Sequence, residues 1–200
     1  MTRVSRLHKL FLRICLGSIA GVAIVSGCME VRSTVIPEAS GSRPEIVVFD
    51  VDGTLTPSVA EILTPRPDAA KAVSRYAANG YHVVYLTVRV ELFQGTLPML
   101  LNKNGFPHGD IIVPETDAEH DHPEVFKARI LYEYRARGWE VAAAYGDSAT
   151  DFLAYADAGI PKEKVYALRR SGEADCEHGT WKKCLSGWSE HLEEIPHEGK

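Results

Sequence analysis

The chain has 200 residues, of which 45% are apolar and 24% charged, a composition typical of one globular domain that excludes a disordered or fibrous chain. Its formal net charge is −5, and removal of residues 1–27, which hold four basic residues and no acid, would lower it to −9. Such an acidic domain has no general attraction for nucleic acid or anionic lipid. Any phosphate that it binds must be held by a local group of cations.

The first 27 residues have the form of a secretory signal peptide. A basic start precedes an uncharged apolar run over residues 14–27, which is shorter than the roughly 20 residues that a helix needs to span a bilayer. The run ends in Val25-Ser26-Gly27-Cys28, which resembles the lipobox of bacterial lipoproteins. The resemblance implies that Cys28 becomes an acylated N-terminus and that the protein is exported and anchored to a membrane on its periplasmic face. Residue 29 is Met and not Asp, which favours sorting to the outer membrane. The alternatives to a lipoprotein signal are a plain membrane anchor and an ordinary cleaved signal peptide.

Residues 28–44 contain Pro, Ser and Gly and show no hydrophobic period, so we expect a flexible tether there. A domain is expected over residues 45–192 and a C-terminal tail over residues 193–200. Outside the leader and Cys28, the remaining cysteines are Cys176 and Cys184, and an even pair in an exported protein predicts a disulfide. A zinc site that adds His178 to this pair is the less favoured alternative.

Strand-like and helix-like segments alternate from residue 45 onward. Apolar runs predict strands over residues 46–49, 81–86, 111–113, 141–145 and 165–168, and 3.6-residue periods predict helices over 69–77, 93–101, 126–134 and 150–158. This alternation predicts an α/β fold, a Rossmann-like parallel sheet with helices on both faces. In such sheets ligands bind beyond the carboxyl ends of the strands.

Polar side chains follow three of the predicted strands. Asp50 and Asp52 follow the first, Thr87 and Arg89 the second, and Asp147 the fourth, so all are expected at one edge of the sheet. There, one carboxylate can attack a phosphoryl group, and a second can protonate the leaving oxygen and then activate water. Carboxylates with waters and substrate oxygens are also the ligands that Mg²⁺ prefers, and Asp50, Asp147 and the backbone carbonyl of Asp52 would supply them.

Structural roles are the alternatives for these residues. Asp50 and Asp52 could form a turn, and Thr87 and Arg89 could end an exposed strand. Lys127, on the helix predicted over residues 126–134, is a further candidate, and it could be a solvated helix residue. Asp151 could instead form part of a capping box at the start of a helix. His120 and His122 are expected in a solvated acidic loop, and His82 is expected to be a structural strand residue.

Four motifs in order resemble those of the haloacid-dehalogenase (HAD) superfamily of phosphatases. They are Asp50-Val51-Asp52-Gly53-Thr54, Leu86-Thr87-Val88-Arg89, Phe126-Lys127-Ala128-Arg129 and Gly146-Asp147-Ser148-Ala149-Thr150-Asp151. The resemblance implies that Asp50 is the nucleophile and Asp52 the acid and base. It also implies that Thr87 and Lys127, with Arg89, bind the phosphate, and that Mg²⁺ is held by Asp50, Asp52, Asp147 and Asp151.

Residues 45–192 further resemble the domain shared by lipins and the C-terminal part of membrane-associated phosphatidylinositol-transfer proteins. Asn104-Gly105-Phe106-Pro107-His108-Gly109 and Gly187-Trp188-Ser189-Glu190-His191-Leu192 carry this likeness. It implies a Mg²⁺-dependent phosphomonoesterase acting on phosphatidate or another phosphate presented by a membrane, and the segments between the motifs leave no room for a large cap domain. The alternatives are a non-catalytic phosphatidate-binding module and a general acid phosphatase for small soluble esters.

Overall fold

The computed structural model describes residues 33–196. The predicted signal peptide over residues 1–27 and the predicted lipidation of Cys28 lie outside these residues. Within them, no helix is both long enough and apolar enough to cross a membrane.

Six parallel strands form one sheet in the order β3-β2-β1-β4-β5-β6. The five strands predicted from the apolar runs are present with small shifts at their ends, and the predicted α/β fold is confirmed. The sixth strand was not predicted, because three residues with two polar or half-buried side chains give no periodic signal. The strands are β1 Glu45–Phe49, β2 His82–Leu86, β3 Asp110–Ile112, β4 Glu140–Gly146, β5 Val165–Leu168 and β6 Lys183–Leu185.

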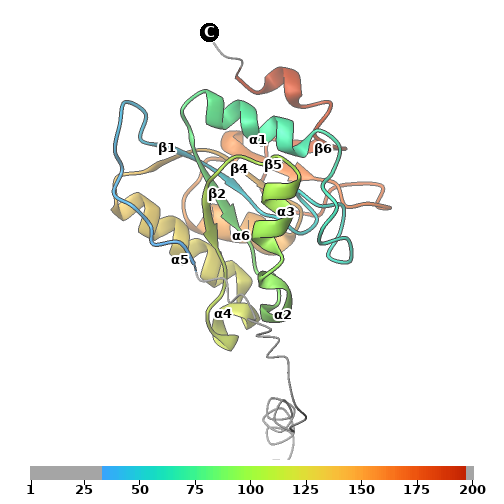
Figure 1. The fold of residues 1–200 in the computed structure, drawn as a ribbon, viewed down its shortest axis with the longest axis horizontal. Helices are drawn as coiled ribbons and strands as arrows, with labels where there is room; N and C mark the ends of the chain where they lie inside the picture. The colour runs from blue at the N-terminus through green and yellow to red at the C-terminus, as the bar shows by residue number, and fades with distance from the viewer. Residues whose placement is uncertain (1–32, 197–200) are drawn as a thin grey trace, which may run out of the picture.

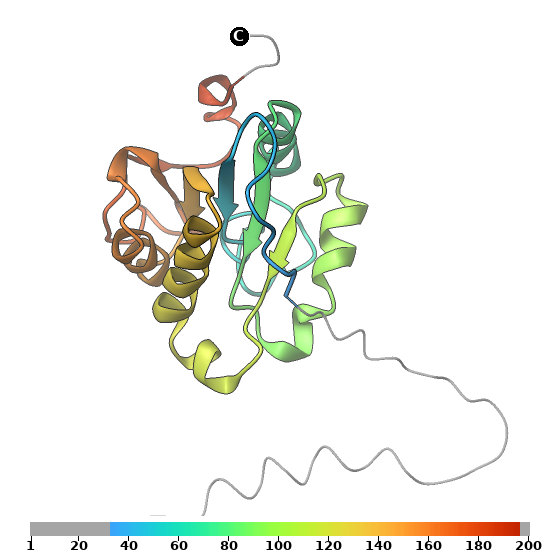
Figure 2. The ribbon, with the colours of Figure 1, turned by 90° about the vertical axis from the view of Figure 1, so that its left-hand side faces the viewer.

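Helices cover both faces of the sheet (Figures 1 and 2). One core joins α1 (Ala69–Ala78) and α3 (Leu97–Lys103) to the face that carries Phe49 and Tyr85. The other core joins α5 (Pro123–Ala136) and α6 (Ala149–Asp157) to the opposite face. The central strands β1, β2 and β4 are therefore shielded from water on both sides over most of their length, as parallel sheets require.

Two local predictions are wrong. The single helix expected over residues 93–101 is two short helices, α2 (Glu91–Gln94) and α3, because the chain turns at Gly95 and Thr96. The loop expected around His120 and His122 contains a short helix, α4 (Asp117–Asp121), whose first turn is capped by the Thr116 side chain accepting from the Glu119 backbone N–H. Short 3₁₀ turns occur at η2 (Lys162–Lys164) and η3 (Leu192–Glu194).

The flexible tether predicted over residues 28–44 is wrong for residues 33–39, which pack on the domain. The Thr34 backbone N–H donates to the carbonyl of Ile111 at 2.9 Å, and the Ala39 N–H donates to that of Arg137 at 2.8 Å. The side chain of Ile36 is buried in the core beneath α5. This segment covers the outer edge of β3, which protects an otherwise unpaired strand edge. The lack of hydrophobic period misled the prediction, because one apolar anchor and backbone pairing are enough to hold a strand-edge segment.

The predicted tail over residues 193–200 is likewise wrong at its start. Ile195 is 1% exposed and belongs to the core that contains α1. The Asn79 side-chain amide also donates to the carbonyl of Pro196 at 2.9 Å. The domain therefore extends at least to residue 195, beyond the predicted end at 192.

Cys176 and Cys184 form a disulfide that ties the segment after β5 to β6, which excludes the zinc site considered for this pair. The loop closed by this bond spans 8 residues of sequence separation. Replacing both cysteines by serine is expected to lower the free energy of unfolding by about 2–3 kcal/mol, because the unfolded chain regains the entropy of the open loop. Urea unfolding of the oxidised chain and of the double variant measures this difference. Equal midpoints and slopes would show that the bond adds no stability.

Candidate functional site

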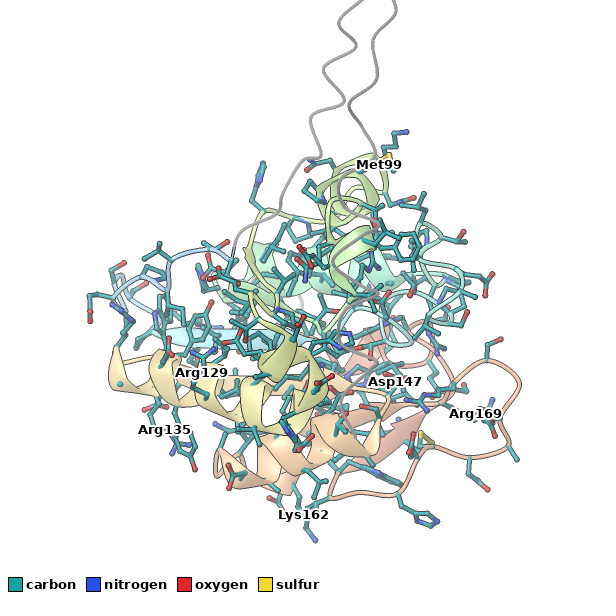
Figure 3. All side chains as sticks on the ribbon, turned by 90° about the horizontal axis from the view of Figure 1, so that it is seen from below. Met99, Arg129, Arg135, Asp147, Lys162 and Arg169 are labelled. Carbon is teal, nitrogen blue, oxygen red and sulfur yellow. A yellow bond between two sulfur atoms is a disulfide. The ribbon has the colours of Figure 1, made fainter. Side chains whose placement is uncertain are left out.

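The site lies at the point in the sheet where the strand order reverses. The chain continues from β1 to β2 toward one edge of the sheet and from the neighbouring β4 to β5 toward the other edge. Open parallel sheets bind ligands at such a point, beyond the carboxyl ends of the strands. Asp50 follows β1 directly, Thr87 follows β2, and Asp147 follows β4. Figure 3 views the molecule from this edge, with Asp147 toward the middle of the face and Arg135 and Lys162 at its periphery.

Asp50 and Lys127 form a buried ion pair at the centre of the site. Lys127 Nζ donates to Asp50 Oδ1 at 2.7 Å and to Asp151 Oδ1 at 2.5 Å, and its side chain is 2% exposed. Lys127 reaches the site from α5, whose buried stripe it shares with Phe126 and Ile130. The reading of Lys127 as a solvated helix lysine is therefore wrong.

Asp151 has both of the roles considered for it. Its Oδ2 accepts hydrogen bonds from the backbone N–H groups of Asp147 and Ser148, and the Ser148 hydroxyl caps the Asp151 N–H, which completes a capping box for α6. Its Oδ1 meanwhile faces Lys127. The cap thus fixes both the start of the helix and the position of a carboxylate in the site.

Three buried carboxylates gather at this point. Asp50, Asp147 and Asp151 each offer an oxygen, and these oxygens lie within 4.8 Å of one another. Asp147 Oδ2 also accepts from Arg170 Nε at 2.5 Å, and Asp147 Oδ1 accepts from the Thr54 hydroxyl at 3.4 Å. The carboxylate of Asp52 is not among these oxygens, so the contact of Asp52 with Mg²⁺ stays a prediction for its backbone carbonyl.

The electrostatics of the cluster suit a divalent cation. Burial raises the pKa of Asp50 well above its ordinary value; Lys127 opposes this effect, and the neighbouring Asp151 and Asp147 add to it. Burial, with Asp151, also raises the pKa of Asp147, against the opposing effect of Arg170. Asp50 Oδ2 is buried without a hydrogen-bond partner. A buried carboxylate oxygen without a partner is costly, and Mg²⁺ bound by these oxygens would relieve that cost, so the donor set fits the predicted ion.

Asp52 is held by two of the three residues predicted to bind phosphate. Arg89 donates from Nε to Asp52 Oδ2 at 3.0 Å and from Nη2 to Oδ1 at 2.5 Å, and the Thr87 hydroxyl donates to Oδ2 at 3.2 Å. The pair of parallel bonds is the forked geometry in which arginine also binds phosphate. Arg89 is buried, so its reading as an exposed strand end is wrong.

Gly53 brings the backbone of the first loop against Asp147. Its φ is +93°, and a Cβ added there would lie 2.1 Å from Asp147 Oδ2. Gly53→Ala is expected to displace the Asp147 carboxylate and to weaken Mg²⁺ binding at least about tenfold, because the turn strain and the clash act together. Isothermal titration with Mg²⁺ measures this loss, and Gly80→Ala, also at positive φ but in open space, is the matched control for backbone strain. Unchanged affinity in Gly53→Ala alone would contradict the assignment.

Two arginines of the site were missed in the sequence. Arg170 contacts Asp147 and also pairs with Glu177 at 2.8 Å. Arg66 donates to the carbonyls of Gly53 and Arg169 at 2.6 and 2.8 Å, which ties the first loop to the end of β5. The place of Arg170 just beyond a predicted strand was a usable signal, whereas Arg66 lies in an irregular loop that gave none.

The site opens into a cleft of about 430 Å³, which is charged at its base and apolar at its mouth and which Arg66 does not line. The predicted catalytic, phosphate-binding and metal-binding residues all contribute to it, together with Arg170. Its apolar walls are Val59, Ile62, Val88, Val90 and Phe93.

Comparison with known proteins finds relatives of this chain among much longer proteins. The chain is 28% identical over 167 residues to phosphatidic acid phosphohydrolase 1 of Saccharomyces cerevisiae, covering 66% of this chain and 19% of that protein. It is 28% identical over 172 residues to membrane-associated phosphatidylinositol transfer protein 3 of Mus musculus, covering 82% of this chain and 16% of that protein. The chain therefore spans less than a fifth of the length of these relatives.

Solved structures share the fold at low sequence identity. A HAD-like phosphatase from Mesorhizobium loti matches with a TM-score of 0.50 and 16% identity, covering 86% of this chain and 94% of that one. D,D-heptose 1,7-bisphosphate phosphatase from Burkholderia thailandensis matches with a TM-score of 0.50 and 14% identity, covering 75% and 97%. The family model described as PITM 1-3, LNS2 domain, matches residues 47–169. Because that match covers more than half of the sequence, the chain belongs to the LNS2 domain family.

Proposed function

We propose that this chain is a Mg²⁺-dependent phosphomonoesterase that acts through an aspartyl-phosphate on Asp50. The observation that carries the proposal is the state of the buried Asp50 carboxylate. One of its oxygens accepts a hydrogen bond from Lys127, and the other has no hydrogen-bond partner. The carboxylates of Asp147 and Asp151 lie close by. A carboxylate held in this way is poised to receive an electrophile, and the HAD-like fold supports the same reading.

The reaction has two steps. Asp50 attacks phosphorus, and the bond to the leaving oxygen breaks while Asp52 gives that oxygen a proton. Water then attacks the phosphorus of the aspartyl-phosphate, Asp52 takes its proton, and inorganic phosphate and free Asp50 result. Bound Mg²⁺ supplies neutralisation of the phosphoryl charge, for which Asp50, Asp147, Asp151 and the carbonyl of Asp52 are the proposed ligands.

Substrate binding would free the Asp52 carboxylate from its present hydrogen bonds, so that it can transfer protons. Arg89 and Thr87 now donate three hydrogen bonds to the Asp52 carboxylate. A phosphoryl group offers the same donors equivalent oxygens, so its arrival can take over these contacts and free Asp52 to turn toward the leaving oxygen. Arg89 and Thr87 are thus assigned to phosphate binding, with Lys127.

The substrate and location form the finer part of the proposal. Resemblance to a phosphatidic acid phosphohydrolase favours phosphatidate, and the lipobox-like leader favours an exported chain anchored through Cys28, with residues 45–195 as the working domain. The family match to transfer-protein domains keeps a second candidate, a phosphatidate-binding module without catalysis. Retention of both Asp50 and Asp52 favours the enzyme.

Phosphate release from a panel of substrates separates these possibilities. We expect the full chain to release inorganic phosphate from phosphatidate in vesicles faster than from nucleotides or sugar phosphates, and only with Mg²⁺. Binding of phosphatidate without release would identify the binding module instead. Faster release from the soluble esters would identify a general phosphatase.

A further inference from the structure

The mouth of the cleft carries exposed apolar side chains on two loops. Val59 and Leu63 lie on the loop after β1, and Val90, Leu92 and Phe93 lie on the loop and short helix after β2. Val59 is 77% exposed and Leu92 is 83% exposed. We name these five residues the apolar rim. Apolar side chains gathered beside a ligand cleft are typical of a surface that contacts another apolar phase.

The rim is continuous with the cleft. Val59, Val90 and Phe93 belong both to the rim and to the cleft wall that leads down to Asp50, whereas Leu63 and Leu92 lie outside the cleft. A substrate could therefore pass from the rim to the charged base along apolar side chains. Such a path suits a phosphate group carried on an apolar body, whereas a small polar ester gains nothing from it.

The start of the described chain lies at this same edge of the molecule. The Ser33 hydroxyl donates to the carbonyl of Val113, directly beyond the carboxyl end of β3, at 2.7 Å. In Figure 2 this blue end lies at the lower side, where the strand arrows point and where α2 lies, and the chain end near Pro196 lies at the opposite side. Four residues lie between Cys28 and Ser33, so the five steps of chain would keep Ser33 within about 18 Å of an anchored Cys28, whatever conformation those residues take.

We propose that the apolar rim is a bilayer-docking surface, which the short N-terminal connection holds against the membrane so that the cleft opens directly onto lipid. This inference rests on the proposed function and on the proposed anchor at Cys28. The occupant of the rim is the bilayer that carries the anchor, because the described chain begins at the edge where the rim lies. The connection from Cys28 to Ser33 is too short to let that edge stand far from the membrane.

The charges at this edge define what kind of contact it is. Two acidic residues, Glu61 and Glu91, neighbour the rim residues in the chain, and no Lys or Arg other than Arg89 lies within residues 59–63 or 89–93. These carboxylates give the rim no electrostatic attraction to a bilayer, so docking must come from apolar burial, and binding to neutral phosphatidylcholine vesicles is expected to be insensitive to salt.

Lipid proximity of the rim can be measured directly on the full chain. Leu92→Cys carries a fluorescent label, and the chain is incorporated through its own anchor into phosphatidylcholine vesicles that contain nitroxide-labelled lipid. We expect strong quenching of the label at position 92 and little at Tyr132→Cys, which is also exposed but lies on α5. Equal quenching at the two positions, or none at either, would overturn the docking surface.

A second readout separates docking from catalysis. Leu63→Glu/Leu92→Glu, which leaves the cleft wall intact, is expected to lower phosphate release from phosphatidate in phosphatidylcholine vesicles about tenfold or more, because two exposed apolar side chains that would contact the bilayer become charged. Release from p-nitrophenyl phosphate in solution is expected to stay unchanged. Equal loss on both substrates, or loss on neither, would contradict docking.

The two proposals fail in different ways. If the wild-type chain releases phosphate from neither substrate but position 92 is quenched, the docking surface stands and the phosphatase does not. If both substrates turn over but the double variant and the label show no effect, the phosphatase stands and docking does not. A concentration-dependent dimer that protects position 92 from lipid would assign the rim to a second copy and overturn the proposal.

Discussion

Asp50→Asn is expected to abolish phosphate release, lowering kcat by at least roughly 10⁴-fold, while the fold stays intact. The amide has almost the same shape as the carboxylate but cannot act as the attacking group. Lys127 keeps its partner Asp151, and the variant relieves repulsion in a cluster where burial and neighbouring carboxylates already raise the pKa of Asp50. The free energy of unfolding is therefore expected to stay equal or to rise slightly.

Steady-state phosphate release and urea unfolding measure the two effects. Asp157→Asn is the matched control, because this residue is exposed at the end of α6 and away from the cleft. Both properties should be unchanged in the control. An Asp50→Asn variant that retains even a tenth of the wild-type rate would remove Asp50 from the role of nucleophile.

Lys127→Met is expected to abolish activity and to lower the free energy of unfolding by about 3–5 kcal/mol. Burial lowers the pKa of Lys127, but the charges of Asp151 and Asp50 more than offset this and raise it, so the side chain is a cation at neutral pH. Without it, two buried carboxylates face each other with no counter-charge. Lys71→Met, at an exposed position on α1, is expected to change stability by less than about 0.5 kcal/mol.

A second variant separates the electrostatic role from the catalytic one. Lys127→Met/Asp151→Asn removes one of the stranded charges, so it should recover part of the lost stability in urea unfolding without recovering phosphate release. If the single variant is as stable as the wild type, the buried ion pairs do not hold the site together. Recovery of activity in the double variant would show that Lys127 does not bind the phosphoryl group.

The sequence predicted the position of the site because the chemistry-bearing residues follow strands. Asp50, Thr87 and Asp147 each come directly after an apolar run, and the carboxyl ends of parallel strands meet at one edge. Lys127 was placed by its motif, and the structure adds that it bridges two carboxylates. The capping box at Ser148 was visible as spacing alone, since both of its hydrogen bonds are local.

Side-chain contacts between residues far apart in the chain could not be predicted from the sequence. Arg89 was assigned to substrate, but its partner in the structure is Asp52, 37 residues earlier, and no local pattern encodes such a contact. Arg170 reaches Asp147 only after β5 has crossed to its place beside β4. The edge segment at Thr34 and the buried Ile195 were missed because each is held by tertiary contacts instead of a hydrophobic period.

The most direct test of the account is to find where the phosphoryl group goes. Enzyme mixed with substrate and Mg²⁺, quenched rapidly in acid and reduced with borohydride, converts an aspartyl-phosphate to homoserine, which peptide mass spectrometry can locate. We predict homoserine at position 50 alone, absent without Mg²⁺ and absent in Asp50→Asn. Homoserine at position 52, 147 or 151, or turnover with no modified aspartate at all, would contradict a mechanism in which Asp50 attacks phosphorus.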